Sequence, residues 1–70
     1  MESVVLDGKK IEYEKNAYDG IKYLRDDLDF LERRVFFDQA KMRGEAPFED
    51  DEDRQFTLLH KSNTYTLLRL

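Results

Sequence analysis

The chain has 70 residues, with 12 Lys and Arg against 16 Asp and Glu, a formal net charge of −4 and no cysteine. This length allows one small domain with a thin core, and the lack of cysteine excludes disulfides, thiolate chemistry and cysteine-ligated metal sites. The acidic balance disfavours a nucleic-acid partner, because domains that grip phosphates usually carry net positive charge on one face.

No stretch approaches the roughly 18 apolar residues of a membrane span, and the first ten residues lack the basic start and apolar block of a secretory signal. We therefore expect a cytoplasmic protein with no membrane partner. The charge is unevenly distributed along the chain. Residues 44–53 carry six acidic and no basic side chains, whereas residues 54–70 carry three basic and no acidic ones.

Residues 1–14 are expected to form a β-hairpin. Its turn is Asp7-Gly8, because a tight hairpin turn of this kind needs positive φ at both central residues. A two-residue loop pairs Leu6 with Lys9 and gives the hairpin one apolar and one mostly polar face, as a half-buried sheet requires. The apolar face consists of Val4, Leu6, Ile11 and Tyr13.

Residues 17–43 are expected to form one long helix, with Asn16 as its N-cap and Gly44 as its C-terminal stop. Apolar residues alternate at steps of four and three along one stripe: Ala17, Ile21, Leu24, Leu28, Leu31 and Val35. Such a helix is about 40 Å long, whereas a five-residue strand spans only about 17 Å. Either the helix breaks near Arg33–Phe37, or its second half projects beyond the sheet.

A second aromatic stripe flanks the first one. Tyr23, Phe30 and Phe37 recur at intervals of seven, and Phe36 lies beside the last of them. One interpretation is that these rings widen the buried face. The other is that they contact a second copy or a partner, since neighbours on a helix point about 100° apart and cannot both enter one small core.

Residues 44–54 are expected to form an acidic loop that contains Glu49, Asp50, Asp51, Glu52 and Asp53. A run of like charges is usually a solvated linker, but it is also able to dock on a basic partner. A variant of the docking idea is mimicry of nucleic-acid phosphates, extended by helix acids and interrupted by arginines. Those acids are Asp26, Asp27, Asp29 and Glu32, and the arginines are Arg25, Arg33 and Arg34. Within the loop, Phe48 is either a core anchor or an exposed recognition residue.

Residues 55–70 are expected to form a second hairpin with two possible registers. A two-residue loop at Ser62-Asn63 places Phe56, Leu58, Tyr65 and Leu67 on one face. A three-residue loop instead groups Phe56, Leu58, Leu68 and Leu70. In both registers the opposite face keeps apolar residues, which again indicates association.

Little in the sequence indicates catalysis. The one histidine, His60, lies beside the second turn, and the glycines at 8, 20 and 44 do not form a phosphate loop. The acidic run lacks the alternation and turn glycine of an EF-hand. We therefore expect no enzyme activity, no cofactor, no catalytic residue and no metal ligand.

Together these patterns predict a single α+β domain of hairpin, helix and hairpin (ββαββ), with an antiparallel sheet and the helix packed on one face. We expect a homodimer whose interface is the second half of the helix with the Phe36–Phe37 region. We also expect a regulatory or adaptor role in which the acidic loop binds a basic protein. The expected protein-binding residues are Tyr23, Phe30, Phe36, Phe37, Phe48 and residues 49–53. Two alternatives stay open: a nucleic-acid module that uses Lys61, Arg69, Tyr65 and Phe56, and a subunit of a larger complex.

Overall fold

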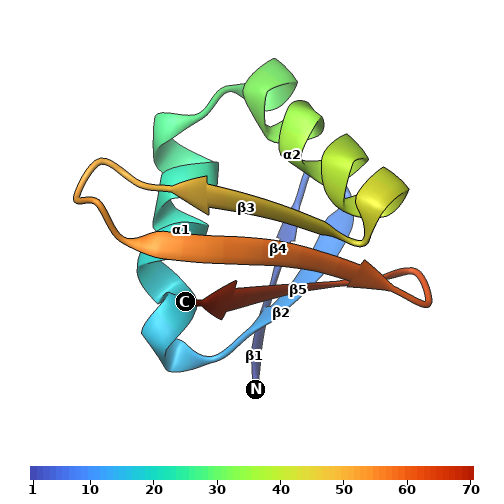
Figure 1. Cartoon of the computed structure of the whole chain (residues 1–70), viewed down its shortest axis with the longest axis horizontal. Helices are drawn as coiled ribbons and strands as arrows, with labels where there is room; N and C mark the ends of the chain where they lie inside the picture. The colour runs from blue at the N-terminus through green and yellow to red at the C-terminus, as the bar shows by residue number, and fades with distance from the viewer.

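The computed structural model describes residues 1–70 and shows an α+β fold with a five-stranded mixed sheet (Figure 1). The strands lie in the order β1-β2-β5-β4-β3, and both helices, α1 and α2, pack on the same side of the sheet. The strands are β1 (Glu2–Leu6), β2 (Lys9–Tyr13), β3 (Glu45–Glu49), β4 (Gln55–Lys61) and β5 (Thr64–Arg69). The helical elements are η1 (Lys15–Ala17), α1 (Tyr18–Lys22), η2 (Tyr23–Asp27) and α2 (Phe30–Arg43).

The α+β class is thus confirmed, but two finer features of the predicted fold are wrong. The sheet has five strands instead of four, and it is mixed, because β2 runs parallel to β5 with Ile11 beside Tyr65. The other three strand pairs are antiparallel. The expected single helix over residues 17–43 is divided into two. None of the helices could span a membrane, because each is too short or too polar.

The N-terminal hairpin has the predicted register, with Leu6 opposite Lys9 and Val4 opposite Ile11. Its turn residues Asp7 and Gly8 have φ values of 52° and 78°, the left-handed conformation that an Asp-Gly turn favours. The predicted apolar face points to the core, where Leu6 and Ile11 are buried. The hairpin therefore joins the sheet as its sequence predicts.

The break between the helical segments lies at Leu28–Asp29, and not near Arg33–Phe37. Leu28 adopts an extended conformation with φ −103° and ψ 145°, after the π-helical turn η2. Asp29 then caps α2: its carboxylate accepts the backbone N–H of Glu32 at 2.8 Å, and the Glu32 carboxylate accepts the backbone N–H of Asp29 at 2.9 Å. This reciprocal capping box starts a new helix and satisfies two otherwise unpaired donors.

The break also explains why the predicted apolar stripe is only half correct. Ala17, Ile21 and Leu24 are buried, but Leu31 and Val35 are exposed because the new helix starts with a different rotation. Phe37 and Ala40 are the core residues of α2.

The two predicted helix ends differ in outcome. Asn16 lies inside the turn η1 and forms no side-chain cap, so the predicted N-cap is wrong. Gly44 does end α2 as predicted, with φ 88°.

Part of the expected acidic loop is the edge strand β3. Its residues alternate between exposed and buried, so that Ala46 and Phe48 enter the core while Glu45, Pro47 and Glu49 face solvent. Proline is tolerated here because an edge strand leaves one row of backbone N–H groups unpaired. Phe48 is therefore a core anchor, in agreement with the first of its two interpretations.

The C-terminal hairpin has the two-residue loop at Ser62-Asn63, with Lys61 opposite Thr64. Phe56, Leu58, Tyr65 and Leu67 accordingly line the core. Helix α1 approaches this layer closely, since a Cβ built on Gly20 would lie 2.8 Å from the Phe56 ring and 2.9 Å from Leu67. The glycine thus sets the distance between helix and sheet.

Candidate binding surface

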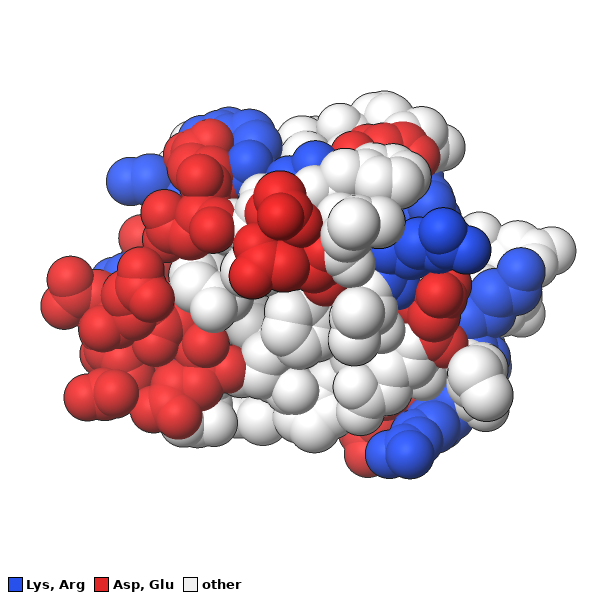
Figure 2. Space-filling model, turned by 90° about the horizontal axis from the view of Figure 1, so that it is seen from above, with Lys and Arg blue, Asp and Glu red and all other residues white.

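Carboxylates from two distant parts of the sequence meet at one end of the molecule. They surround a hollow of about 240 Å³ between α1, η2 and the loop that joins β3 to β4. Figure 2 shows acidic side chains covering this end of the surface. We call this region the acidic face, and it consists of Asp19, Lys22, Tyr23, Asp26, Asp27, Asp50, Asp51, Glu52 and Arg54. Six carboxylates therefore surround only two cations.

The β3–β4 loop is ordered by Asp50, whose side chain is only 3% exposed. Its carboxylate accepts backbone N–H groups from Glu52 at 3.0 Å and Arg54 at 2.9 Å, and the Arg54 Nε at 2.6 Å. Burial alone would raise the pKa of Asp50, but the hydrogen bonds from Arg54 and Glu52 outweigh burial and lower the pKa below its usual value. Asp50 is thus a structural residue that presents its acidic neighbours.

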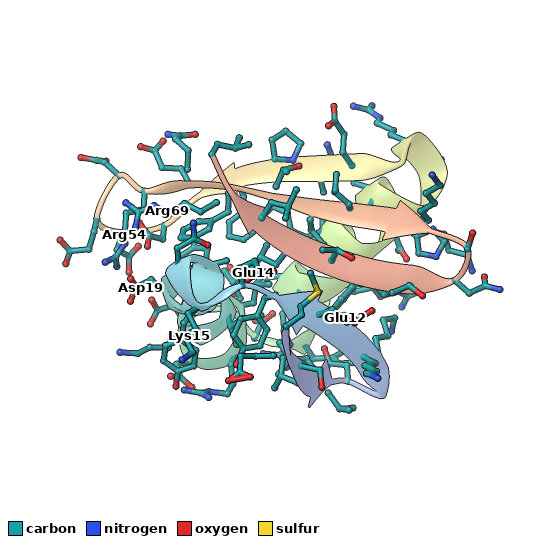
Figure 3. The ribbon with its side chains drawn as sticks, turned by 90° about the horizontal axis from the view of Figure 1, so that it is seen from below. Glu12, Glu14, Lys15, Asp19, Arg54 and Arg69 are labelled. Atoms are coloured by element: carbon teal, nitrogen blue, oxygen red, sulfur yellow. The ribbon has the colours of Figure 1, made fainter.

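Arg54 joins this loop to the first helix. Its Nη1 lies 3.2 Å from the Asp19 carboxylate while its Nε binds Asp50, and Figure 3 shows Arg54 and Asp19 side by side. Arg54 is therefore already paired with two carboxylates of the acidic face. Asp26 accepts hydrogen bonds from Nε and Nη2 of Arg25 at 2.8 and 2.9 Å. The other three acids, Asp27, Asp51 and Glu52, have no hydrogen bond from a cation of the chain.

Asp27 and Asp51 show the effect of bringing like charges together. Asp27 belongs to η2 and Asp51 to the β3–β4 loop. The pKa of Asp27 is raised above its ordinary value, mainly by desolvation. The charge of Asp51 and a hydrogen bond between the two side chains raise the pKa of Asp27 further. Beside them, burial raises the pKa of Tyr23, and the charge of Asp51 adds to this shift. Negative potential therefore concentrates around the half-buried ring of Tyr23.

The structure brings some of the predicted binding residues together and separates others. Asp51, Glu52 and Tyr23 belong to the acidic face, as does the structural Asp50. Asp53 and Glu49 are exposed and do not line the hollow. Phe30 is exposed on α2 and lies outside the hollow.

The remaining predicted aromatic residues belong to the core or its edge. Phe37 and Phe48 are buried, and Phe36 is half-buried with its ring centroid 5.2 Å from that of Phe48. The prediction that Phe37 lies at a dimer interface is therefore wrong, because its side chain is already buried within a single chain. Two adjacent phenylalanines do not need two surfaces here, because the Phe37 ring meets Tyr65 of β5 while the Phe36 ring meets Phe48 of β3.

The helix acids behave differently from one another. Asp26 and Asp27 extend the acidic face as the phosphate-mimicry variant expects, whereas Asp29 and Glu32 form the capping box. Sequence reasoning missed Asp19 and Arg54. Neither has a local signal, because the ion pair that joins them connects residues 35 positions apart in the chain.

The expected nucleic-acid surface lacks its aromatic part. Phe56 is fully buried and Tyr65 nearly so, where its ring packs edge-on against Phe37 at a centroid distance of 4.9 Å. Neither ring is free to stack on a base. Lys61 and Arg69 lie exposed at opposite ends of the second hairpin.

No protein-family model, no curated protein and no solved structure matches the chain.

Proposed function

We propose that the protein is a non-enzymatic, cytoplasmic interaction protein whose acidic face docks on a basic surface of a protein partner. The observation that supports this function most strongly is the gathering of six carboxylates around one hollow, with one of the two cations there already paired. A partner's Arg or Lys side chains would supply the missing positive charge.

The electrostatics of the hollow favour such a partner. Asp27 and Asp51 repel each other when both are ionised, and an arginine between them would relieve this repulsion while donating two hydrogen bonds. The Tyr23 ring beside them offers an aromatic surface for a guanidinium group. Complementary charge of this kind speeds encounter and excludes partners of the wrong sign.

The support beneath the acidic face is rigid. Tyr23 stacks on Phe48 with ring centroids 5.9 Å apart, and Phe48 stacks on Phe56 at 5.5 Å, so the hollow rests directly on the core. The loop above it is fastened by Asp50. A preorganised surface loses little conformational freedom on binding, which favours affinity.

We expect neutralisation of the acidic face to weaken partner binding strongly, provided that Asp50 is kept to preserve the loop. The variant Asp26→Asn, Asp27→Asn, Asp51→Asn, Glu52→Gln should bind a labelled arginine-rich peptide about tenfold more weakly than wild type in fluorescence anisotropy at low salt. In an affinity pull-down analysed by mass spectrometry, the specific basic prey should disappear with this variant.

A matched control distinguishes the loss of charge at the hollow from an equal loss of charge elsewhere on the surface. The variant Glu2→Gln, Glu12→Gln, Glu14→Gln, Glu45→Gln removes the same number of charges outside the hollow and should bind like wild type. If the two variants lose the peptide equally and return the same prey as wild type, then the acidic face is not the binding surface and the proposal is wrong.

A further inference from the structure

The outer face of α2 carries an apolar stripe that nothing in the chain covers. Leu31, Val35 and Met42 are 65%, 62% and 85% exposed. They are spaced by four and seven residues and therefore share one side of the helix. Val35 is about 160° around the helix from the buried Phe37, so this stripe points directly away from the core. In Figure 1 no other element lies over the upper side of α2.

The fold itself does not need these three side chains. The core of α2 is supplied by Phe37 and Ala40, with Phe36 packed beside them. Single exposed apolar residues are ordinary, but three large ones on one side of a helix form an apolar stripe, and exposed apolar surface of this kind marks sites of association. The charges on the two flanks of the stripe indicate what binds to it.

Each flank of the stripe carries one acid and one base, placed towards opposite ends of the helix. Arg34 and Asp38 lie on one side, where they form an exposed ion pair at 3.6 Å. Glu32 and Arg43 lie on the other side. If a second helix lies antiparallel to the first, the acid of one flank therefore faces the base of the same flank on the second helix.

We propose that the outer face of α2 binds the same face of a second copy, with the two helices antiparallel about a two-fold axis. This interface lies outside the acidic face and does not depend on the proposed function. Placing Leu31 against Met42 of the second copy puts the axis at the middle of α2. A two-fold axis brings each flank against the same flank of the other copy.

In this register the charges match at both flanks. Arg34 comes within about one residue's rise, roughly 1.5 Å along the axis, of Asp38 of the second copy. Glu32 comes within about two residues' rise, roughly 3 Å, of Arg43 of the second copy. The symmetry makes each pair occur twice, so four ion pairs surround the apolar stripe. A parallel two-fold pairing would instead bring opposite flanks together and leave Asp38 about five residues' rise, roughly 7.5 Å along the axis, from Arg43 of the second copy.

Two helices of this length cover less than the roughly 800 Å² per partner of a standard interface, so the dimer should be concentration-dependent. We expect sedimentation velocity to show dimer formation at about 100 µM chain. Val35→Glu should raise the dimer dissociation constant about tenfold or more, because it places two carboxylates at the axis. Val5→Glu is the matched control: Val5 is equally exposed at 64%, but it lies in β1, and this variant should dimerise like wild type.

A charge-swap experiment tests the orientation. Arg34→Asp alone and Asp38→Arg alone should each dimerise poorly, because each places like charges across the axis. An equimolar mixture of the two variants should form a heterodimer, since every contact across the axis is then between opposite charges. Circular dichroism of each variant checks that the fold is intact.

Three results would overturn the proposal. The first is a wild-type chain that stays monomeric at about 100 µM. The second is a dimer that is unaffected by Val35→Glu. The third is a mixture of the two swapped variants that associates no better than either one alone. A dimer that Val5→Glu disrupts and Val35→Glu does not would assign the interface to the sheet edge instead.

Discussion

Replacing Phe37 with alanine should lower the free energy of unfolding by about 3–5 kcal/mol, the usual cost of removing a buried phenylalanine side chain. The Phe37 side chain is 1% exposed, meets Tyr65 edge-on and lies below the ammonium group of Lys9, 5.1 Å from the ring centroid. A chain of this size has a total stability of roughly 4–10 kcal/mol, so the variant should be partly unfolded at room temperature. Urea titration followed by circular dichroism measures this loss.

Two further variants make the Phe37 result interpretable. Phe37→Leu keeps most of the side-chain volume and should cost clearly less than the alanine variant, at about 1.5 kcal/mol. Val35→Ala removes an apolar side chain from the exposed face of the same helix and should change stability by no more than about 0.5 kcal/mol. A Phe37→Ala protein that is as stable as wild type would show that the packing of α2 described above is wrong.

Replacing Arg33 with alanine should destabilise the protein by about 3 kcal/mol, far more than any other surface arginine. The Arg33 guanidinium donates Nε to Asp7 at 2.7 Å and Nη2 to the other Asp7 oxygen at 3.1 Å. Its Nη1 bonds the carbonyl oxygens of Leu24 at 3.1 Å and Leu28 at 2.8 Å, which the helix break leaves without helical partners. One side chain thus joins the first hairpin, the end of η2 and α2.

Arg34 provides a control at the neighbouring position. Its side chain is 63% exposed and its only ion pair is with Asp38 at 3.6 Å, so Arg34→Ala should cost no more than about 0.5 kcal/mol. Arg33→Lys should recover part of the loss, because a lysine keeps the charge but cannot make the two-pronged contact with Asp7. Equal stabilities of the Arg33→Ala and Arg34→Ala proteins would contradict this role.

The Asp7–Arg33 pair also makes a pH-dependent contribution to stability. The hydrogen bond from Arg33 lowers the pKa of Asp7 from its ordinary value of 3.8. Because the folded state has the lower pKa, the contribution is fully present above the unfolded value and is lost as the pH falls through the folded one. The stability of wild type should therefore decrease below about pH 4 more steeply than that of Arg33→Ala.

The parts of the fold that the sequence predicts are those set by neighbouring residues. Asp7-Gly8 and Ser62-Asn63 accept the positive φ values of tight turns, and alternation of apolar residues then fixes which side of each hairpin is buried. Gly44 ends α2 for the same local reason. These features need no knowledge of distant contacts.

The helix break has a local signal that the long apolar stripe concealed. Asp29 and Glu32 form the D-x-x-E pattern of a capping box, but the spacing of Leu28, Leu31 and Val35 continues the helical period across it. The stripe looked like a buried face because an outward-facing apolar stripe has the same periodicity as a core-facing one. The contact of Arg33 with Asp7, 26 positions away, joins α2 to the first hairpin and has no local signal in the sequence.

Strand β3 and the strand order had weaker signals still. Acidic residues and Pro47 are typical of loops, and only the burial of Ala46 and Phe48 reveals the strand. Parallel and antiparallel strands share the same two-residue period, so no pattern in the sequence shows that β2 lies parallel to β5. The acidic face depends on the helix break and on the β3–β4 loop, because these two features together bring Asp27 to Asp51.

The acidic face exists only if the fold brings Asp27 to Asp51, and a titration of Asp27 followed by carboxyl NMR reports on this contact. In wild type the pKa of Asp27 should lie above its ordinary value, and Asp51→Asn should lower it because the neighbouring charge is removed. Asp53→Asn, in the same loop, should have a much smaller effect. An Asp27 that titrates at or below its ordinary value in wild type, and identically in the Asp51→Asn protein, would contradict the acidic face.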